Sequence, residues 1–137
     1  MAVVILRPDT FGGTPEHPYA RRWRLIPKNR ALNVMINQFL MTDPIKEPHG
    51  HPSFSLSLVL RGRYFEEEGD RVRERRPWSF KFRGPWSFHR ITMKPGESSL
   101  SLFIQGPEFW TWGFRCGDGR VLSSEEYFGK NGNGCNA

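Results

Sequence analysis

The sequence has few cysteines and no long apolar run, and these absences exclude several protein classes. The two cysteines, Cys116 and Cys135, are too few for a disulfide framework in a chain of 137 residues. They can pair in principle, but we predict free thiols. No apolar run reaches the roughly 18 residues of a membrane span. The apolar residues 2–6 lack the basic leader and cleavage site of a signal peptide. We therefore predict a soluble, cytoplasmic protein with no membrane partner.

Familiar nucleophile and nucleotide motifs are also missing. Cys116 precedes Gly-Asp-Gly and has no histidine near it in the sequence. The pair Gly12-Gly13 opens no predicted helix and carries no lysine, which excludes a common phosphate-binding loop. These negatives disfavour the common hydrolases and nucleotide-dependent enzymes.

Aromatic residues, glycine and proline are plentiful. The chain has 11 Phe and 5 Trp, spread over short segments that 14 Gly and 11 Pro interrupt. Many short alternating segments between turn residues are typical of an all-β barrel, and helical periodicity is scarce. We predict one jelly-roll barrel over residues 1–130 and a flexible Gly- and Asn-rich tail over residues 131–137.

The alternation of polar and apolar residues predicts where the strands lie. Residues 53–60 give the clearest signal, because they read Ser, Phe, Ser, Leu, Ser, Leu, Val, Leu. The Pro95-Gly96 turn predicts a hairpin of residues 89–93 and 99–105. Ser123, with Glu126 three residues later, predicts a capped short helix through Phe128. Further strands are predicted at residues 2–6, 23–26, 32–40, 64–68, 70–76 and 112–115, and a loop at residues 10–18.

Three histidines form a candidate metal site. His49 and His51 are two residues apart, so in an extended strand both imidazoles lie on one face. His89 lies on a later aromatic segment and would complete the set. Pro52 cannot donate a ladder hydrogen bond, so we predict a bulge there that shifts the strand by one residue and turns Leu56 inward. Without the shift the serines face inward, which makes a poorer core.

This pattern resembles the cupin superfamily. The first cupin motif reads His-x-His, three or four residues, Glu, six residues and Gly, and His49-Gly50-His51 with Gly62 fits that frame. His89 stands where the second motif has a histidine. Other segments resemble cupin-like proteins of bacteria and their phages that carry no assigned activity. These segments are residues 21–27 (Arg-Arg-Trp-Arg-Leu-Ile-Pro), Leu60-Arg61-Gly62, Gly106-Pro107 and Trp112-Gly113-Phe114.

The sequence departs from the cupin pattern at several positions. The motif glutamate falls on Ser55 or Leu56, which are not carboxylates. Asp43 replaces the usual first-motif glycine, and Met93 stands in place of the second-motif asparagine. The group would also have a histidine near Asn37, and none is present. The Pro-x-Gly of the second motif is not reproduced before His89.

The resemblance implies a jelly-roll fold and a divalent transition metal, Fe, Ni, Cu or Zn, held by His49, His51 and His89. Cupin-like thiol dioxygenases have a three-histidine centre without a carboxylate. We expect Asn37, Ser55 and Leu56 around the centre, and Arg61 or Arg90 holding an anionic group near the mouth.

Three functions remain open at this stage. The first is a metal-dependent enzyme, oxygenase- or isomerase-like, that acts on a small molecule. The second is a non-catalytic, metal-free ligand-binding or assembly module, in which the histidines are structural. The third is nucleic-acid binding through arginines Arg71, Arg73, Arg75 and Arg76. We favour cross-strand ion pairs with the acidic residues 66–68 and Asp70 over that third function. The sheet edges of such a barrel also allow a homodimer.

Overall fold

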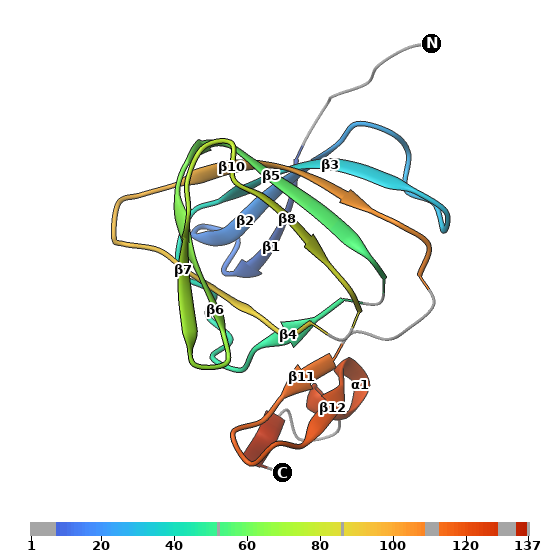
Figure 1. Cartoon of the computed structure of the whole chain (residues 1–137), viewed down its shortest axis with the longest axis vertical. Helices are drawn as coiled ribbons and strands as arrows, with labels where there is room; N and C mark the ends of the chain where they lie inside the picture. The colour runs from blue at the N-terminus through green and yellow to red at the C-terminus, as the bar shows by residue number, and fades with distance from the viewer. Residues whose placement is uncertain (1–7, 52, 86, 109–112, 129–133, 137) are drawn as a thin grey trace.

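The computed structural model describes residues 8–51, 53–85, 87–108, 113–128 and 134–136 of the chain. Within these ranges most of the regular structure is antiparallel sheet (Figure 1). The largest sheet has six strands in the order β1-β2-β3-β10-β5-β8. These strands are β1 (Asp9–Gly13), β2 (Pro18–Arg24), β3 (Asn33–Phe39), β10 (Ser99–Gln105), β5 (Ser55–Gly62) and β8 (Phe80–Arg83).

A smaller sheet forms the opposite wall of the barrel. Its strands are β7 (Arg71–Arg75), β6 (Tyr64–Glu68) and β9 (Arg90–Thr92), in the order β7-β6-β9. The short strand β4 (His49–Gly50) lies next to this wall through an isolated bridge between His49 and His89. The two walls enclose the interior seen in Figure 1. The prediction of an all-β jelly-roll barrel is confirmed.

The C-terminal part packs at one end of the barrel (Figure 1). Strands β12 (Val121–Ser123) and β11 (Gly113–Arg115) add to β4, and α1 (Ser124–Tyr127) and η1 (Gly134–Asn136) follow. The predicted helix cap is present, because Glu126 N donates to Ser123 Oγ and Ser123 N donates to Glu126 Oε1, both at 3.2 Å. Within the described ranges, no helix has the length and apolar character needed to cross a membrane.

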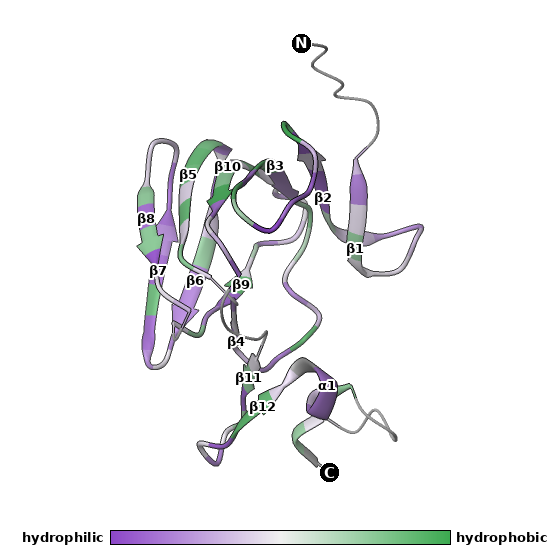
Figure 2. Cartoon of the chain, turned by 90° about the vertical axis from the view of Figure 1, so that its right-hand side faces the viewer, coloured by the Kyte–Doolittle hydropathy of each residue, from purple (hydrophilic) through white to green (hydrophobic). Residues whose placement is uncertain are grey.

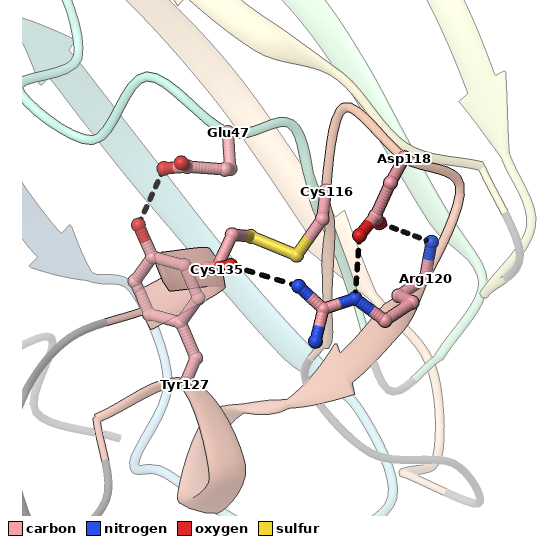
Figure 3. Close-up of a disulfide and its surroundings, with 6 residues drawn as sticks. All are labelled: Glu47, Cys116, Asp118, Arg120, Tyr127 and Cys135. Carbon is pink, nitrogen blue, oxygen red and sulfur yellow. Dashed lines mark hydrogen bonds and ion pairs between the residues drawn. A yellow bond between two sulfur atoms is a disulfide. The ribbon is translucent and has the colours of Figure 1, made fainter. Parts of the chain in front are cut away.

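A disulfide joins Cys116 to Cys135, so the prediction of two free thiols is wrong (Figure 3). Sequence alone left pairing open because the two residues are 19 positions apart, and only the fold brings their Cα atoms to 5.7 Å. Arg120 adds a second link, since its Nη2 donates to the Cys135 carbonyl oxygen at 2.8 Å. The bond attaches part of the predicted tail to the segment after β11. The end of the barrel domain at residue 130 stays a prediction.

Two local predictions need correction. Residues 10–18 are not all loop, because β1 pairs with β2 in the register Phe11 opposite Ala20. Residues 89–93 and 99–105 do not form a hairpin, because β9 pairs with β6 while β10 pairs with β3 and β5. Here the successive strands β9 and β10 lie in opposite walls, so the turn between them does not fix their partners. The strand predicted at residues 2–6 lies outside the described residues.

The inner face of β5 carries serines, so the prediction that Leu56 turns inward is wrong. Ser55 and Ser57 are buried, whereas Leu56 and Leu58 lie half-exposed on the outer face. Strand β10 repeats the pattern, with Ser101 opposite Val59 on the inside. Figure 2 shows the hydrophobic residues as green bands along both strands. The buried positions of β5 continue the alternation that starts at His51, so the serines of β5 and β10 lie in the interior.

The apolar core occupies one part of the interior. Aromatic rings follow one another from β1 to β6, with centroid distances of 5.8 Å from Phe11 to Tyr19, 5.4 Å from Tyr19 to Phe39 and 5.6 Å from Phe39 to Tyr64. The buried members of this cluster are Tyr19, Ala20, Phe39, Val59, Tyr64, Ile91 and Met93. The rest of the interior combines polar side chains with further buried apolar ones such as Met35, Phe103 and Phe114.

Candidate metal centre

The three predicted histidines meet inside the barrel. One ring nitrogen from each of His49, His51 and His89 lies within 4.8 Å of the others. The backbone bridge fixes two of them, because His49 N donates to the His89 oxygen at 2.9 Å and His89 N donates to the His49 oxygen at 3.0 Å. His51 follows β4 directly, and its Nε2 is 3.1 Å from Nε2 of His89.

The donor set fits a transition-metal ion. Metal–nitrogen bonds of about 2.1 Å place neighbouring ligand atoms roughly 3.0–3.4 Å apart, depending on geometry. The 3.1 Å between the two Nε2 atoms falls in this range. Burial is the main cause that lowers the pKa of both His51 and His89 well below the usual value, so both rings are neutral near pH 7. Neutral imidazole is the form that binds metal.

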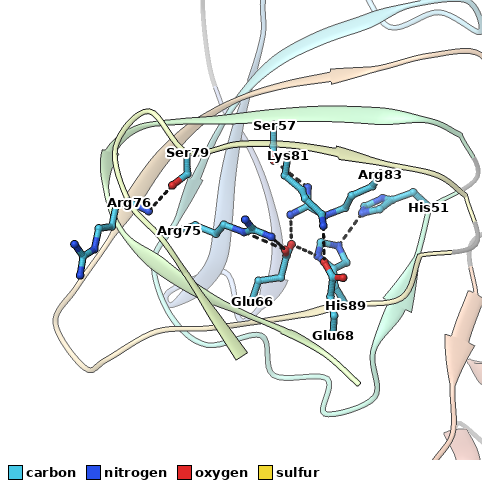
Figure 4. A network of polar contacts seen from close by, with 10 residues as sticks. All are labelled: His51, Ser57, Glu66, Glu68, Arg75, Arg76, Ser79, Lys81, Arg83 and His89. Carbon is cyan, nitrogen blue, oxygen red and sulfur yellow. Dashed lines mark hydrogen bonds and ion pairs between the residues drawn. The ribbon is translucent and has the colours of Figure 1, made fainter. Parts of the chain in front are cut away.

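Glu66 orients His89. The carboxylate lies on the inner face of β6 with 1% exposure, and its Oε2 is 2.7 Å from His89 Nδ1 (Figure 4). A proton on Nδ1 donates to this oxygen, which leaves the lone pair of Nε2 facing the other histidines. The sequence analysis counted Glu66 only as an ion-pair residue of the hairpin. Its position in the strand could have predicted this role, because Glu66 is two residues after the inward Tyr64 and therefore lies on the same face of β6.

Two arginines also bind Glu66. Arg75 Nη2 donates to Oε1 at 2.8 Å, and Arg83 Nη2 donates to Oε2. Arg83 Nη1 donates to Ser57 Oγ at 2.9 Å. Burying one carboxylate with two guanidinium groups leaves an excess of positive charge beside the histidines. The low dielectric of the interior makes this charge more influential than the same charge at the surface.

Asp43 is the acidic neighbour of His49. Its Oδ2 lies 3.5 Å from His49 Nδ1, and its Oδ1 accepts a hydrogen bond from Ile45 N at 2.9 Å. The carboxylate is 5% exposed. Asp43 is therefore placed to orient the second histidine, at a position where the sequence departs from the cupin pattern.

A cavity of about 490 Å³ opens in front of the three histidines. Asn37 lines it, together with Ser57 and Ser101 from the inner sheet face. Ser55 is buried on the same face of β5, whereas Leu56 lies on the opposite face and cannot supply a group to the centre. The volume is typical of a pocket for a small molecule.

Neither of the two arginines predicted at the mouth, Arg61 and Arg90, is among the residues that line the cavity. Arg61 is exposed and pairs in register with Leu100 on the outer side of β10. Arg90 donates through Nε to the Ile45 oxygen at 3.1 Å and through Nη2 to the Asp43 oxygen at 3.0 Å. The arginines that line the cavity are Arg22 and Arg83, which no motif marked.

The arginine-rich hairpin β6–β7 makes ion pairs, with partners that differ from simple cross-strand ones. Arg75 binds Glu66, and Arg76 Nη2 lies 3.0 Å from Glu74 Oε2. Glu68 lies 3.6 Å from Lys81 Nζ instead of pairing with Arg71. The cross-strand interpretation therefore accounts for Arg75, whereas Arg76 pairs with Glu74 of its own arm.

No family model matches this sequence, and no curated protein matches it. Solved structures do match. A protein from Ralstonia eutropha JMP134 to which mannose-6-phosphate isomerase activity is attributed is 17% identical, with 72% of this chain and 92% of that chain covered at a TM-score of 0.58. A cupin superfamily protein from Desulfitobacterium hafniense DCB-2 is 15% identical, with 65% and 78% covered at a TM-score of 0.55. The fold is cupin-like.

The third matching protein is longer than this chain. Hydroxypropylphosphonic acid epoxidase from S. wedmorenis is 17% identical, with a TM-score of 0.56 over 72% of this chain and 55% of the epoxidase. Structures of HppE with iron(II) and cobalt(II) also match. The cupin-like fold thus spans little more than half of the epoxidase.

Proposed function

We propose that this protein is a metal-dependent enzyme that acts on a small molecule, with the metal held by His49, His51 and His89. The observation that carries the proposal is the convergence of three ring nitrogens within 4.8 Å at the wall of a cavity. Three nitrogen ligands leave positions open for water or substrate. Iron, nickel, copper and zinc all accept such a set.

The protein's own residues prepare the centre. Glu66 holds the proton of His89 on Nδ1, and Asp43 lies beside Nδ1 of His49. Burial of His51 and His89 keeps water away from two of the three ligands. When bound, the metal would supply a Lewis acid and a site for dioxygen or substrate oxygen.

The cupin-like structures support an enzyme of oxygenase or isomerase type. Those named above include an isomerase and an epoxidase, and HppE occurs with iron(II) and cobalt(II). Their identity to this chain is below 20%, so they support the fold, and the three histidines beside the cavity carry the proposal of a metal-dependent reaction.

Elemental analysis tests the proposal. We expect stoichiometric iron, nickel, copper or zinc in protein purified without chelator or nickel resin, and loss of that metal in His51→Ala. His17→Ala is the matched control, because His17 is exposed in the loop between β1 and β2. Wild-type protein that stays metal-free after incubation with each ion would contradict the proposal.

A second candidate is a metal-free ligand-binding module. The contact that favours it is the 3.1 Å approach of His51 Nε2 to His89 Nε2, which a hydrogen bond between the rings explains without any ion. His89 also satisfies its other nitrogen through Glu66. Under this alternative, His51→Ala lowers the free energy of unfolding. Added metal then changes the melting temperature of neither the wild type nor the variant.

A further inference from the structure

Arg22 projects from β2 toward the cavity without a carboxylate partner. It pairs in register with Asn37 of β3, and its Nε donates to Asn37 Oδ1 at 2.9 Å. The guanidinium carbon lies 4.8 Å from the centroid of the Phe11 ring. Among the residues that the structure describes, no carboxylate lies within ion-pair distance of Arg22. Asp9 stands opposite Arg22 in the register of β1 and β2 and its charge acts on Arg22, but its exposed carboxylate makes its ion pair with Arg24 at 3.5 Å.

The Arg22 side chain remains charged in this position. Burial lowers the pKa of Arg22 to about 10, so the guanidinium is protonated at neutral pH. A mostly buried cation with no opposite charge is unfavourable unless something supplies that charge. The two terminal nitrogens of its planar fork suit the paired oxygens of a carboxylate, phosphonate or phosphate.

The other charges around the cavity do not neutralise Arg22. Glu66 is already bound by Arg75 and Arg83, and Asp43 lies against His49. Two arginines, Arg22 and Arg83, therefore line the cavity with one carboxylate, Asp43.

A large part of the cavity wall is apolar. Phe39, Phe103 and Phe114 line it with Ile45 and Ile91. This part accommodates a carbon skeleton, and the hydroxyl groups of Ser57 and Ser101 are uncharged. A ligand matching both parts has one oxyanion and an apolar body.

We propose that Arg22, held by Asn37, binds the oxyanion of a small organic acid whose carbon skeleton lies against the aromatic wall in front of the histidines. The identity of this acid as the substrate rests on the proposed function, but its binding requires no metal. Arg22 and the histidines line the same cavity, so an acid held by Arg22 faces the metal centre.

Titration calorimetry with three probes tests this site on the full chain, as purified and again after chelation. The probes are benzoate, phenylphosphonate and the neutral benzamide. We expect at least one of the two acids to bind the wild type in both samples, and benzamide to bind at least about tenfold more weakly. Arg22→Gln should lose that acid by a similar factor.

The matched control is Arg21→Gln. It removes the same charge one residue away, on the exposed outer side of β2. Arg22→Lys keeps the charge and loses the planar fork, so it tests recognition if Arg22→Gln does not fold. It should bind the acid at least about fivefold more weakly than the Arg21→Gln control.

Three results would overturn the proposal. They are no binding of either acid to the wild type, equal binding of benzamide, and equal binding by the Arg22 variants and Arg21→Gln. Failure of the metal analysis leaves these results unaffected, because the calorimetry is repeated on chelated protein. The two proposals can therefore fail independently.

Discussion

The two faces of the six-stranded sheet differ in a way that reverses the usual order of a small β-barrel. Across the inner face, Asn37 of β3 lies opposite Ser101 of β10. Across the outer face, Ile36, Leu102 and Leu58 form a continuous apolar row. The row ends at Phe80, which is 62% exposed. The inner face thus mixes serine and asparagine with Met35, Phe39, Val59 and Phe103, whereas the outer row is aliphatic.

The difference shows what the interior is for. An interior serving only stability would take the leucines, because burying a leucine side chain contributes about 1.5–3 kcal/mol. Here the same strands give their inward positions to serine and asparagine beside a cavity that holds histidine and arginine. The aromatic cluster around Phe39 and Tyr64 supplies apolar packing in another part of the barrel.

The largest expected effect comes from the inner charge network. Among the residues that the structure describes, Glu66 is the only carboxylate bound to Arg75 and Arg83, so Glu66→Gln leaves two buried cations without their partner. We expect a loss of roughly 3–5 kcal/mol in the free energy of unfolding, measured by urea denaturation. Glu67→Gln, on the same strand with its carboxylate 3.8 Å from Arg90, should change it by less than about 1 kcal/mol. Similar losses in both variants would mean that the inner network has no special role.

Lowering the pH should destabilise the metal-free protein through the inner histidines. The pKa values of His51 and His89 are lowered in the folded state, chiefly by burial, so below about pH 6.5 the unfolded state binds more protons. Their stabilising effect is complete above pH 6.5. It should fall by up to about 2.7 kcal/mol per pH unit as the pH drops from 6 to 5, in urea titrations of chelated protein.

A variant separates the histidines from the carboxylates in this pH dependence. His51→Gln should remove about half of the slope between pH 6 and pH 5. The surface carboxylates Glu74 and Glu97 have pKa values lowered by hydrogen bonds from arginine, so they titrate below this window. An unchanged slope would assign the pH dependence to groups other than His51.

Placing a leucine on the inner face tests the assignment of the two faces. Ser57→Leu adds bulk where Ser57 Oγ accepts a hydrogen bond from Arg83. We expect the free energy of unfolding to fall by about 1–3 kcal/mol. The larger side chain displaces its buried neighbours, and Arg83 loses its hydrogen bond to Ser57. Thermal and urea unfolding measure it.

The smallest effect is expected on the outer face of the same strand. Leu58→Ser removes a half-exposed side chain, so the loss should be about 1 kcal/mol, well below that of a buried leucine. If Leu58→Ser were the more damaging of this pair, the phase of β5 would be the reverse of the one described.

Particular elements show how far sequence could lead. The alternation of residues 53–60 located β5, and the charged runs on either side of Gly69 located the β6–β7 hairpin. The spacing of His49 and His51 indicated a shared face, and the resemblance to cupins added His89. Arg22 lies within one of the segments that resemble cupin-like proteins. The sequence assigned no role to it, because its partner Asn37 is 15 residues away.

The sequence by itself determined β5, the β6–β7 hairpin, the helix cap at Ser123 and the identity of the three histidines, because these follow from local periodicity, spacing and resemblance. Tertiary structure decided which face of β5 lies inside, because alternation defines two faces without saying which is buried. It also decided the disulfide, the role of Glu66 and the exclusion of Arg61 and Arg90 from the cavity. Each of these depends on contacts between residues far apart in the chain, which no local pattern encodes.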